Sequence, residues 1–588
     1  MLTWTDPNDP EPAWLSNGLS GYRIQRSGEA TAGFAAHLYQ RGGEEKLIAS
    51  PMESGPRDFS STITRYRQTL NMRTGELTTE WVSAIGKAYR EISIVNNDGL
   101  LCTKIEPAGW VRSGVSTAKP PLSRDIAEQM RDAADANRML WNTDIEIDGP
   151  VEDQQAVRSF LFYLRMAVHP KGTMSVAPYA LSSETYNGHV FWDADIWVFP
   201  ALCLLDPDRA KTICEYRLAR LEAARMNAKA WFSANPPKNE WQRRSPTGAN
   251  FKPYAEIKDP PLMFPWESGL TGREVAPGES RKEHHITGSV MWSLDTARTL
   301  GLVDPDKVEE AGRGAAKFWL DRIQYGAQKK PGQFGNWGPF EVKDVMSPDE
   351  FHIGDNDLYT NLLANWTLDR FNPKNQLPVK GPAIFGMETR AKGGGGGPSL
   401  HLPDDKTSLL TYDGDPVRGY KQAAAVLAIY PLQFEWAEKQ ARTMMERFES
   451  KVTPNGPAMS DSVHATIWAR LGEAELAYET WHRSWKPFTD HPLMLFSEKR
   501  GKASTYFVTG AAGSLQTVLY GFLGFRIDYR VEPGAAWSKK LNGGYWLSIK
   551  PRLPKAWNKV VLKNFHVLGK RYTLIATPKS VTVTEGES

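Results

Sequence analysis

One glutamate of this chain, Glu350, stands in a segment whose residue types suit proton transfer. Its neighbours are a second carboxylate, Asp349, and an aromatic ring, Phe351, and Pro348 before them disfavours a helix. An acid that hands a proton to a leaving oxygen needs partial desolvation and neighbours that raise its pKa. The segment therefore predicts an acid catalyst in a loop; a solvated acidic turn of the same composition is the competing interpretation.

Two dipeptides place a tryptophan beside a carboxylate in loop-like settings, Trp192-Asp193 and Trp266-Glu267. An indole stacks on the apolar face of a pyranose ring, and a carboxylate accepts hydrogen bonds from two vicinal hydroxyls. The pairs therefore predict a sugar-binding subsite, and the 21 tryptophans of the chain agree with it. Large proteins also bury tryptophan in their cores, which is the alternative.

Three further residues are weaker candidates for the same subsite. Asp195 lies two positions beyond Asp193, which we favour; either aspartate could instead cap a helix that begins near Ile196. Lys421 and Gln422 supply a cation and an amide that can reach sugar oxygens.

A second candidate for acid–base chemistry is Glu498, which follows apolar residues and precedes two cations, Lys499 and Arg500. The cations would hold the carboxylate ionised, as a general base requires. A salt-bridged surface glutamate would have the same surroundings in sequence.

The sequence lacks the motifs of several common enzyme classes. The segment Thr509–Gly513 has the glycines of a phosphate loop but lacks the GK[ST] ending, and no H-E-x-x-H, Cys/His cluster or G-x-S-x-G occurs. The sequence therefore implies no metal and no organic cofactor. Three cysteines (Cys102, Cys203 and Cys214) form no CxxC pair and are expected to be buried thiols.

The composition is that of a large globular protein. The 588 residues are 41% hydrophobic and 24% charged, which allows two to four domains. A net charge of +3 is too small to imply nucleic acid or an acidic membrane as partner. No apolar run approaches the roughly 20 residues that span a bilayer. The start of the chain lacks signal-peptide features, so we expect a cytoplasmic protein, or a periplasmic or secreted one if a leader was removed. Oligomeric state has no sequence signal.

The hydrophobic periodicity divides the chain into three parts. Alternation over 66–81 around a turn at 73–75 predicts a hairpin in an amino-terminal sheet. Residues 124–142 favour a linker helix. Apolar positions spaced for helices then recur, and the predicted helices lie near 157–168, 214–228, 284–300, 308–318, 357–370, 419–430, 434–449, 462–479 and 510–523. Alternation returns after Phe525 and predicts a small β cap.

Two long loops interrupt the helical part. The segment Ser233–Pro261 is rich in Pro, Asn and Lys, and five glycines fill 393–397. Either loop could close over a cleft, or be a tolerated surface insertion.

Taken in order, these segments resemble glycoside hydrolase family 65. The matching segments begin at Tyr66, Gly188, Pro265, Pro348, Lys421 and Thr509, and read YRQTLNMRTGELTT, GHVFWD, PWES, PDEFH, KQA and TGAAG. The resemblance implies a mainly α fold with flanking β: an amino-terminal β-sandwich (1–120), a linker helix (121–150), an (α/α)6 barrel (151–528) and a carboxy-terminal β cap (529–588). The amino-terminal sheet is about a hundred residues shorter than the family usually shows, and the Ser233–Pro261 insertion is atypical.

The resemblance also implies roles for residues. Glu350 would be the general acid at an α-glucosidic bond that is cleaved with inversion. The cleaved glucose would be held by Trp192, Asp193, Trp266, Glu267, Lys421 and Gln422.

The family contains hydrolases and phosphorylases, and the region from Glu498 to Gly513 distinguishes them. Phosphorylases typically carry a Gly-(Ile/Leu)-His element there, which this chain lacks. Glu498 lies eleven residues before Thr509, close to where the family's hydrolases place their base. Ser504 and Thr505 keep the phosphorylase interpretation open.

The resulting hypothesis is an inverting α-glucoside hydrolase that acts on a small carbohydrate, with Glu350 as acid and Glu498 as base. Inversion predicts that the two carboxyl groups lie roughly 6.5–9.5 Å apart, to leave room for a water. Kojibiose, with its α-1,2 linkage, is the first candidate substrate. The alternatives are an inverting phosphorylase that forms β-glucose 1-phosphate and a non-catalytic carbohydrate-binding protein.

Overall fold

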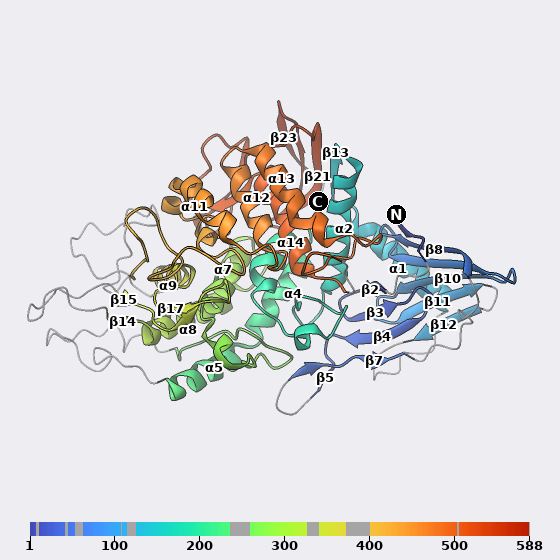
Figure 1. Cartoon of the computed structure of the whole chain (residues 1–588), viewed down its shortest axis with the longest axis horizontal. Helices are drawn as coiled ribbons and strands as arrows, with labels where there is room; N and C mark the ends of the chain where they lie inside the picture. Colours follow the sequence, from blue (N-terminus) through green and yellow to red (C-terminus); the bar gives the residue numbers. More distant parts are fainter. Residues whose placement is uncertain are drawn as a thin grey trace, which may run out of the picture.

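The computed structural model describes residues 1–6, 11–40, 45–52, 63–106, 109–113, 125–235, 259–325, 340–371, 400–501 and 505–586. Amino-terminal strands lie at one end of the molecule, helices make up the middle, and the last strands pack beside β13 (Figure 1). Ser504, the glycine run at 393–397 and most of the Ser233–Pro261 insertion lie outside the described residues.

Three antiparallel sheets form the described amino-terminal part. The first runs β1 (Leu2–Trp4), β8 (Ile63–Asn71), β9 (Glu76–Ser83), β10 (Ala88–Val95), β11 (Leu101–Glu106) and β12 (Gly109–Ser113). The second runs β2 (Ala13–Ser16), β3 (Ser20–Ile24), β4 (Ala30–Ala35) and β7 (Ser50–Pro51), and β5 (Tyr39–Gln40) pairs with β6 (Lys46–Leu47). A hydrogen bond links the first two sheets: the Tyr22 hydroxyl of β3 donates to Gly99 O, in the turn between β10 and β11, at 2.6 Å.

The predicted hairpin is confirmed as β8 and β9, with Asn71 opposite Glu76. Every second side chain of β9 is buried, as the alternation requires. Gly75 takes a φ of +76° in the turn, a conformation that favours glycine.

Helix α1 (Ile126–Leu140) lies in the stretch predicted as a linker helix, and Asp125 caps its first turn. Met130, Ala133 and Ala134 of α1 pack on Ile94 and Cys102, so the helix covers a face of the first sheet. The next segment, β13 (Asp144–Asp148), is a strand, which the sequence did not predict. It pairs with β21, more than 400 residues later in the chain.

The middle of the chain is helical. The helices are α2 (Val151–Ala167), α3 (Phe199–Leu202), α4 (Pro207–Leu218), α5 (Leu221–Ala234), α7 (His285–Thr299), α8 (Pro305–Arg322), α9 (Leu358–Phe371), α10 (Glu435–Lys439), α11 (Ala441–Phe448), α12 (Ser460–Arg470), α13 (Ala474–Trp485) and α14 (Val508–Gln516). Two π-helical turns, η2 (Asp193–Val198) and η9 (Thr517–Phe522), adjoin α3 and α14.

Most of the predicted helices are present, with breaks that the periodicity did not show. The pattern over 462–479 is two helices separated at Gly472, which has a φ of +87°. The prediction of a helix over 419–430 is wrong, because only Ala425–Ala428 (η6) forms a 3-10 turn. Gly419 has a φ of +73° and Pro431 cannot continue a helix, so the segment remains a loop between them.

The last strands form two sheets. β18 (Phe525–Asp528) and β19 (Trp537–Lys540) flank β20 (Trp546–Ile549). The other sheet runs β13, β21 (Lys559–Val567), β22 (Lys570–Ala576) and β23 (Val581–Glu585). The alternation after Phe525 predicted β20, β21, β22 and β23; the sequence did not predict β13, β18 or β19.

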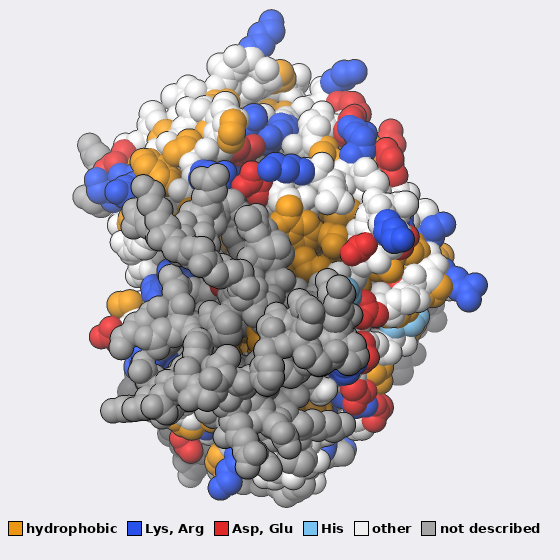
Figure 2. Space-filling view, turned by 90° about the vertical axis from the view of Figure 1, so that its left-hand side faces the viewer, with side chains coloured by type: hydrophobic (Ala, Val, Ile, Leu, Met, Phe, Trp, Pro, Cys, Tyr) orange, Lys and Arg blue, Asp and Glu red, His pale blue; other side chains and the backbone are white. Residues whose placement is uncertain are grey.

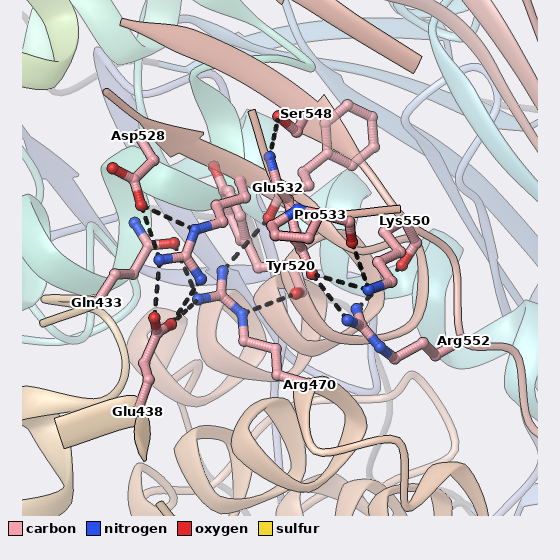
Figure 3. A network of polar contacts seen from close by, with 12 residues as sticks. Gln433, Glu438, Arg470, Tyr520, Asp528, Glu532, Pro533, Ser548, Lys550 and Arg552 are labelled. Atoms are coloured by element: carbon pink, nitrogen blue, oxygen red, sulfur yellow. Dashed lines mark hydrogen bonds and ion pairs between the residues drawn. The ribbon is translucent and has the colours of Figure 1, made fainter. Parts of the chain in front are cut away.

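A charged network ties the helices to the cap (Figure 3). Arg470 of α12 lies 3.8 Å from Glu438 and donates to Gln433 at 2.9 Å. Arg526 of β18 donates to both oxygens of Glu438, at 2.6 and 2.8 Å, and to Asp528 at 2.7 Å. Ion pairs therefore link the helical part of the chain to the carboxy-terminal strands.

On the face drawn in Figure 2, the described acidic and basic side chains are interspersed. Among the residues that the structure describes, no helix is long and apolar enough to cross a membrane.

Candidate active site

The loop that carries Glu350 is the tip of a short hairpin. Its strands are β16 (Val345–Met346) and β17 (Ile353–Gly354), which pair antiparallel. Glu350 itself has a φ of +58°, a left-handed conformation that costs a non-glycine residue about 1 kcal/mol or more. Fully buried Asp349 holds the turn, since it accepts hydrogen bonds from the backbone N–H groups of Phe351 and His352, both at 3.2 Å.

The Glu350 carboxylate has two partners from one neighbouring loop. Lys421 Nζ lies 2.6 Å from Oε2, and Gln422 Nε2 donates to Oε1 at 3.0 Å. Gln422 is buried and also donates to the Pro348 carbonyl at 2.5 Å. The loop that interrupts the predicted helix at 419–430 therefore positions the candidate acid.

The Glu498 carboxylate has tyrosine partners instead. The Tyr179 hydroxyl donates to Oε2 at 2.7 Å, and the Tyr186 hydroxyl lies 2.9 Å from Oε1 and 3.1 Å from Oε2. Burial and the charge of Glu498 raise the pKa of both phenols above the usual range, so they stay protonated as donors. In this structure neither of the adjacent cations, Lys499 and Arg500, is the partner that the sequence suggested for Glu498.

Glu350 and Glu498 line the same cavity, which has about 440 Å³ of empty space, counting the part open to solvent. The rest of the lining is aromatic or apolar apart from two charged side chains, Asp193 and Lys421. The lining residues are Pro178, Tyr186, Phe191, Trp192, Asp193, Trp266, Lys421, Pro457, Met459 and Phe507. The structure thus gathers four of the six sequence-selected sugar contacts around two candidate catalytic carboxylates.

Asp193 is a buried acid in this cavity. It begins the π-helical turn η2, and the Thr509 hydroxyl donates to its Oδ1 at 2.6 Å. Burial raises its pKa to about 7, and the charges of Glu350 and Glu498 add to the shift. Its ionisation therefore changes near neutral pH.

The two tryptophans form one wall. The rings of Trp192 and Trp266 lie 6.3 Å apart at an angle of 39°, and the ring of His285 packs edge-on against both. Phe191 meets Trp266 edge-on at 5.6 Å. The contacts fix the orientation of both indoles.

Glu267 and Asp195 turn away from this lining. Glu267 Oε2 lies 3.0 Å from His189 Nδ1. The fully buried carboxylate of Asp195 forms an ion pair with Arg217 at 2.7 Å. Asp195 is therefore a structural residue of the helical core, and the preference for Asp193 agrees with the cavity. Thr505 is not among the residues that line the cavity.

Several residues of the site carried no recognisable signal in the sequence. Tyr179 and Tyr186 hold Glu498 from more than 300 positions away, and Thr509 belonged to a segment considered only as a phosphate loop. Glu274 accepts hydrogen bonds from the backbone N–H groups of Trp266 and Glu267, at 2.7 and 3.3 Å. Only the fold brings these groups to the motifs.

The sequence matches a known family in regions that supply part of this cavity. Residues 158–234 and 257–390 match the glycosyl hydrolase family 65 central catalytic domain, and residues 544–588 match the glycosyl hydrolase family 65 C-terminal domain. The chain belongs to glycosyl hydrolase family 65. Glu350 lies inside the matched residues and Glu498 outside them, so the position of Glu498 rests on the structure.

Relatives within the family include hydrolases and a phosphorylase. A kojibiose hydrolase of Mucilaginibacter mallensis is 33% identical over 401 residues, 66% of this chain and 52% of the relative. A protein-glucosylgalactosylhydroxylysine glucosidase of Gallus gallus is 30% identical over 412 residues, 66% of this chain and 53% of the relative. A kojibiose phosphorylase of Thermoanaerobacter brockii is 26% identical over 507 residues, 76% of this chain and 58% of the relative. The chain thus spans about half the length of these relatives.

A solved structure from the human microbiome, provisionally described as a kojibiose phosphorylase, shares the fold. It superposes with a TM-score of 0.66 over 100% of this chain and 95% of the other, at 16% identity. The likeness concerns the arrangement of a helical region with flanking sheets.

Proposed function

We propose that this chain is an inverting α-glucoside hydrolase that releases β-glucose from an α-linked glucobiose or a glucosylated glycan. The observation that carries the proposal is the shared cavity, into which two separate loops bring Glu350 and Glu498 beside two indoles and a buried aspartate. An α-1,2 linkage, as in kojibiose, is the first candidate. Relatives named as kojibiose hydrolase and glucosylgalactosylhydroxylysine glucosidase support the hydrolase class.

Glu350 is proposed as the general acid that protonates the glycosidic oxygen. In the free enzyme its oxygens are held by Lys421 and Gln422. Both groups also suit sugar hydroxyls, so a bound glucose competes for them. We infer that the sugar draws Lys421 away from the carboxylate, which leaves that oxygen free to face the glycosidic oxygen.

Glu498 is proposed as the general base that deprotonates a water on the opposite face of the anomeric carbon. Its two oxygens are positioned by the neutral phenols of Tyr179 and Tyr186. Because the two glutamates have separate hydrogen-bond partners, each can change its protonation without breaking the contacts of the other. Inversion predicts a separation of roughly 6.5–9.5 Å between the carboxyl groups.

Trp192, Trp266 and Asp193 are proposed to hold the glucose that is cleaved. The indoles offer stacking surfaces, and Asp193 offers carboxylate oxygens once it is ionised. Glu267 supports this wall through its contact with His189.

In its finer details the fold is proposed to be an (α/α)6 barrel between a β-sandwich and a β cap, with the boundaries predicted above.

The second candidate is an inverting phosphorylase. The similarity to a kojibiose phosphorylase, at 26% identity, supports this candidate. In that case phosphate would replace water as nucleophile and Glu498 would have no role as a base. A carbohydrate-binding protein without turnover is the third, and the presence of both glutamates in the cavity argues against it.

Proton NMR of the purified protein with kojibiose, with and without inorganic phosphate, separates these functions. Early β-glucose without phosphate is expected for the inverting hydrolase. Glucose 1-phosphate formed only with phosphate would reject the hydrolase, and binding without turnover would identify the third class. If kojibiose is inert, the same measurement on trehalose and on α-glucosyl galactosides tests the linkage. An early excess of α-glucose on any of these substrates would contradict inversion.

A further inference from the structure

A second hollow adjoins the candidate catalytic cavity. It holds about 1140 Å³ of open space, and Pro457 and Met459 line both hollows. The chain around these two residues therefore has one side toward the candidate active site and another toward the second hollow. The reaction proposed above uses nothing in this hollow.

Three potential metal ligands converge on its wall. One donor atom each from Glu449, Asp461 and His464 lies within 4.8 Å of the other two. Asp461 and His464 stand three positions apart in α12, so they share a face of that helix. Glu449 comes from the single 3-10 turn η7 (Glu449–Lys451) after α11.

His464 is the observation that points to a ligand. Its side chain is 1% exposed and lines the hollow, yet neither ring nitrogen has a hydrogen-bond partner among the described residues. A neutral imidazole has one nitrogen with a free lone pair, which can bind a metal ion. A buried polar group without a partner is costly, and a bound ion would satisfy it.

A cation already lies between the carboxylates. Arg483 Nη2 is 2.7 Å from Glu449 Oε1 and 3.3 Å from Asp461 Oδ1. Trp468 Nε1 donates to Glu449 at 2.9 Å, and Arg500 lies 3.6 Å from Asp461. The Arg483 side chain is 46% exposed, so it can leave toward solvent and vacate the carboxylate oxygens.

We propose that Glu449, Asp461 and His464 bind a divalent first-row transition-metal ion, which displaces Arg483. One imidazole nitrogen and two carboxylates suit Zn²⁺ or Mn²⁺, whereas Ca²⁺ and Mg²⁺ prefer ligand sets made of oxygen. The ion is structural, in keeping with a reaction that requires none.

The ion would brace a segment that supports both candidate catalytic loops. Ala458 N donates to the Glu498 carbonyl at 2.9 Å, and Thr453 N donates to the Tyr420 carbonyl, beside Lys421, at 2.8 Å. Arg500 Nε donates to the Pro454 carbonyl at 3.0 Å. Because the ligands Glu449 and Asp461 flank this segment, a bound ion ties its two ends together.

The test is calorimetric titration of the metal-free full chain with Zn²⁺, with metal content measured after desalting. One equivalent is expected to bind and to raise the unfolding temperature. His464→Ala and the isosteric Asp461→Asn should each weaken binding by at least about tenfold. His401→Ala, at a half-exposed histidine paired with Asp413, is the matched control and should bind as the wild type does.

Arg483→Gln sharpens the test, because it removes the competing cation and leaves the three ligands in place. It should tighten Zn²⁺ binding, by about fivefold if the lost ion pairs resemble other partly exposed pairs. No binding by the wild type, equal binding by His464→Ala and Asp461→Asn, or weaker binding by Arg483→Gln would each overturn the proposal. None of these outcomes bears on the hydrolase assignment, which the sugar assays decide.

Discussion

The two candidate catalytic carboxylates enter one cavity from unlike surroundings. Glu350 sits on a strained hairpin tip, where an ammonium and an amide from a single loop hold it. Glu498 is held by two phenols that stay neutral. A sugar can displace the charged partner of Glu350, which suits an acid that must give up a proton and take one back in each cycle. The neutral phenols stay on Glu498, which suits a base that must keep its orientation toward the attacking water. The difference supports the proposed roles.

The strongest test of this contrast is Glu350→Gln. Turnover of kojibiose should fall by about 10²–10⁴-fold, because its leaving group needs a proton. Hydrolysis of α-glucosyl fluoride, whose leaving group needs none, should fall far less. Initial rates on the two substrates give the comparison, with Glu152→Gln at an exposed ion pair as the matched control. Equal losses on both substrates would remove Glu350 as the acid.

Glu498→Ala should slow both substrates equally, unlike Glu350→Gln. Turnover should fall about 10²–10⁴-fold on kojibiose and on the fluoride alike, since both need an activated water. Azide should restore part of the rate on the fluoride and form β-glucosyl azide, which NMR detects. Unchanged hydrolysis would exclude Glu498 as the base. Glu222→Ala, at a surface helix position, is the control for alanine substitution.

Asp193 should make stability depend on pH. Burial raises the pKa of its carboxyl from the ordinary value of 3.8 to about 7, so between these values the folded protein holds a proton that the unfolded chain releases. The resulting contribution to stability is complete below pH 4 and is lost as the pH rises to 7. Asp193→Asn should therefore gain stability over the wild type as the pH rises, up to about 4 kcal/mol at pH 8. Urea unfolding of both proteins at pH 5 and 8 measures their difference in stability. A difference that does not change with pH would contradict the raised pKa of Asp193.

The tyrosines should have smaller effects. Tyr179→Phe and Tyr186→Phe each remove a hydrogen bond to a charged carboxylate, and kcat should fall about tenfold for each. Tyr572→Phe removes a Tyr–Glu hydrogen bond of 3.0 Å in the carboxy-terminal sheet and should leave kcat unchanged. If all three variants behaved alike, the two phenols would have no part in positioning Glu498.

The sequence predicted local structure well where a short pattern is enough. The β8–β9 hairpin followed from alternation on both sides of a glycine turn. Helices α2, α7, α8 and α9 lie where the sequence predicted helical stretches. The same reasoning failed at 419–430, where Lys421 and Gln422 form hydrogen bonds to the Glu350 loop instead of joining a helix.

The sequence by itself determined the residue types of the site, the order of the motifs and the family. Each motif is a run of neighbours, and such runs are visible without a fold. Only the tertiary structure decided which side chains meet: Asp193 faces the cavity while Asp195 turns to Arg217, and Tyr179 reaches Glu498 across 319 positions. β13 likewise finds its partner more than 400 residues away. Such pairings depend on how the elements pack, and no local spacing encodes them.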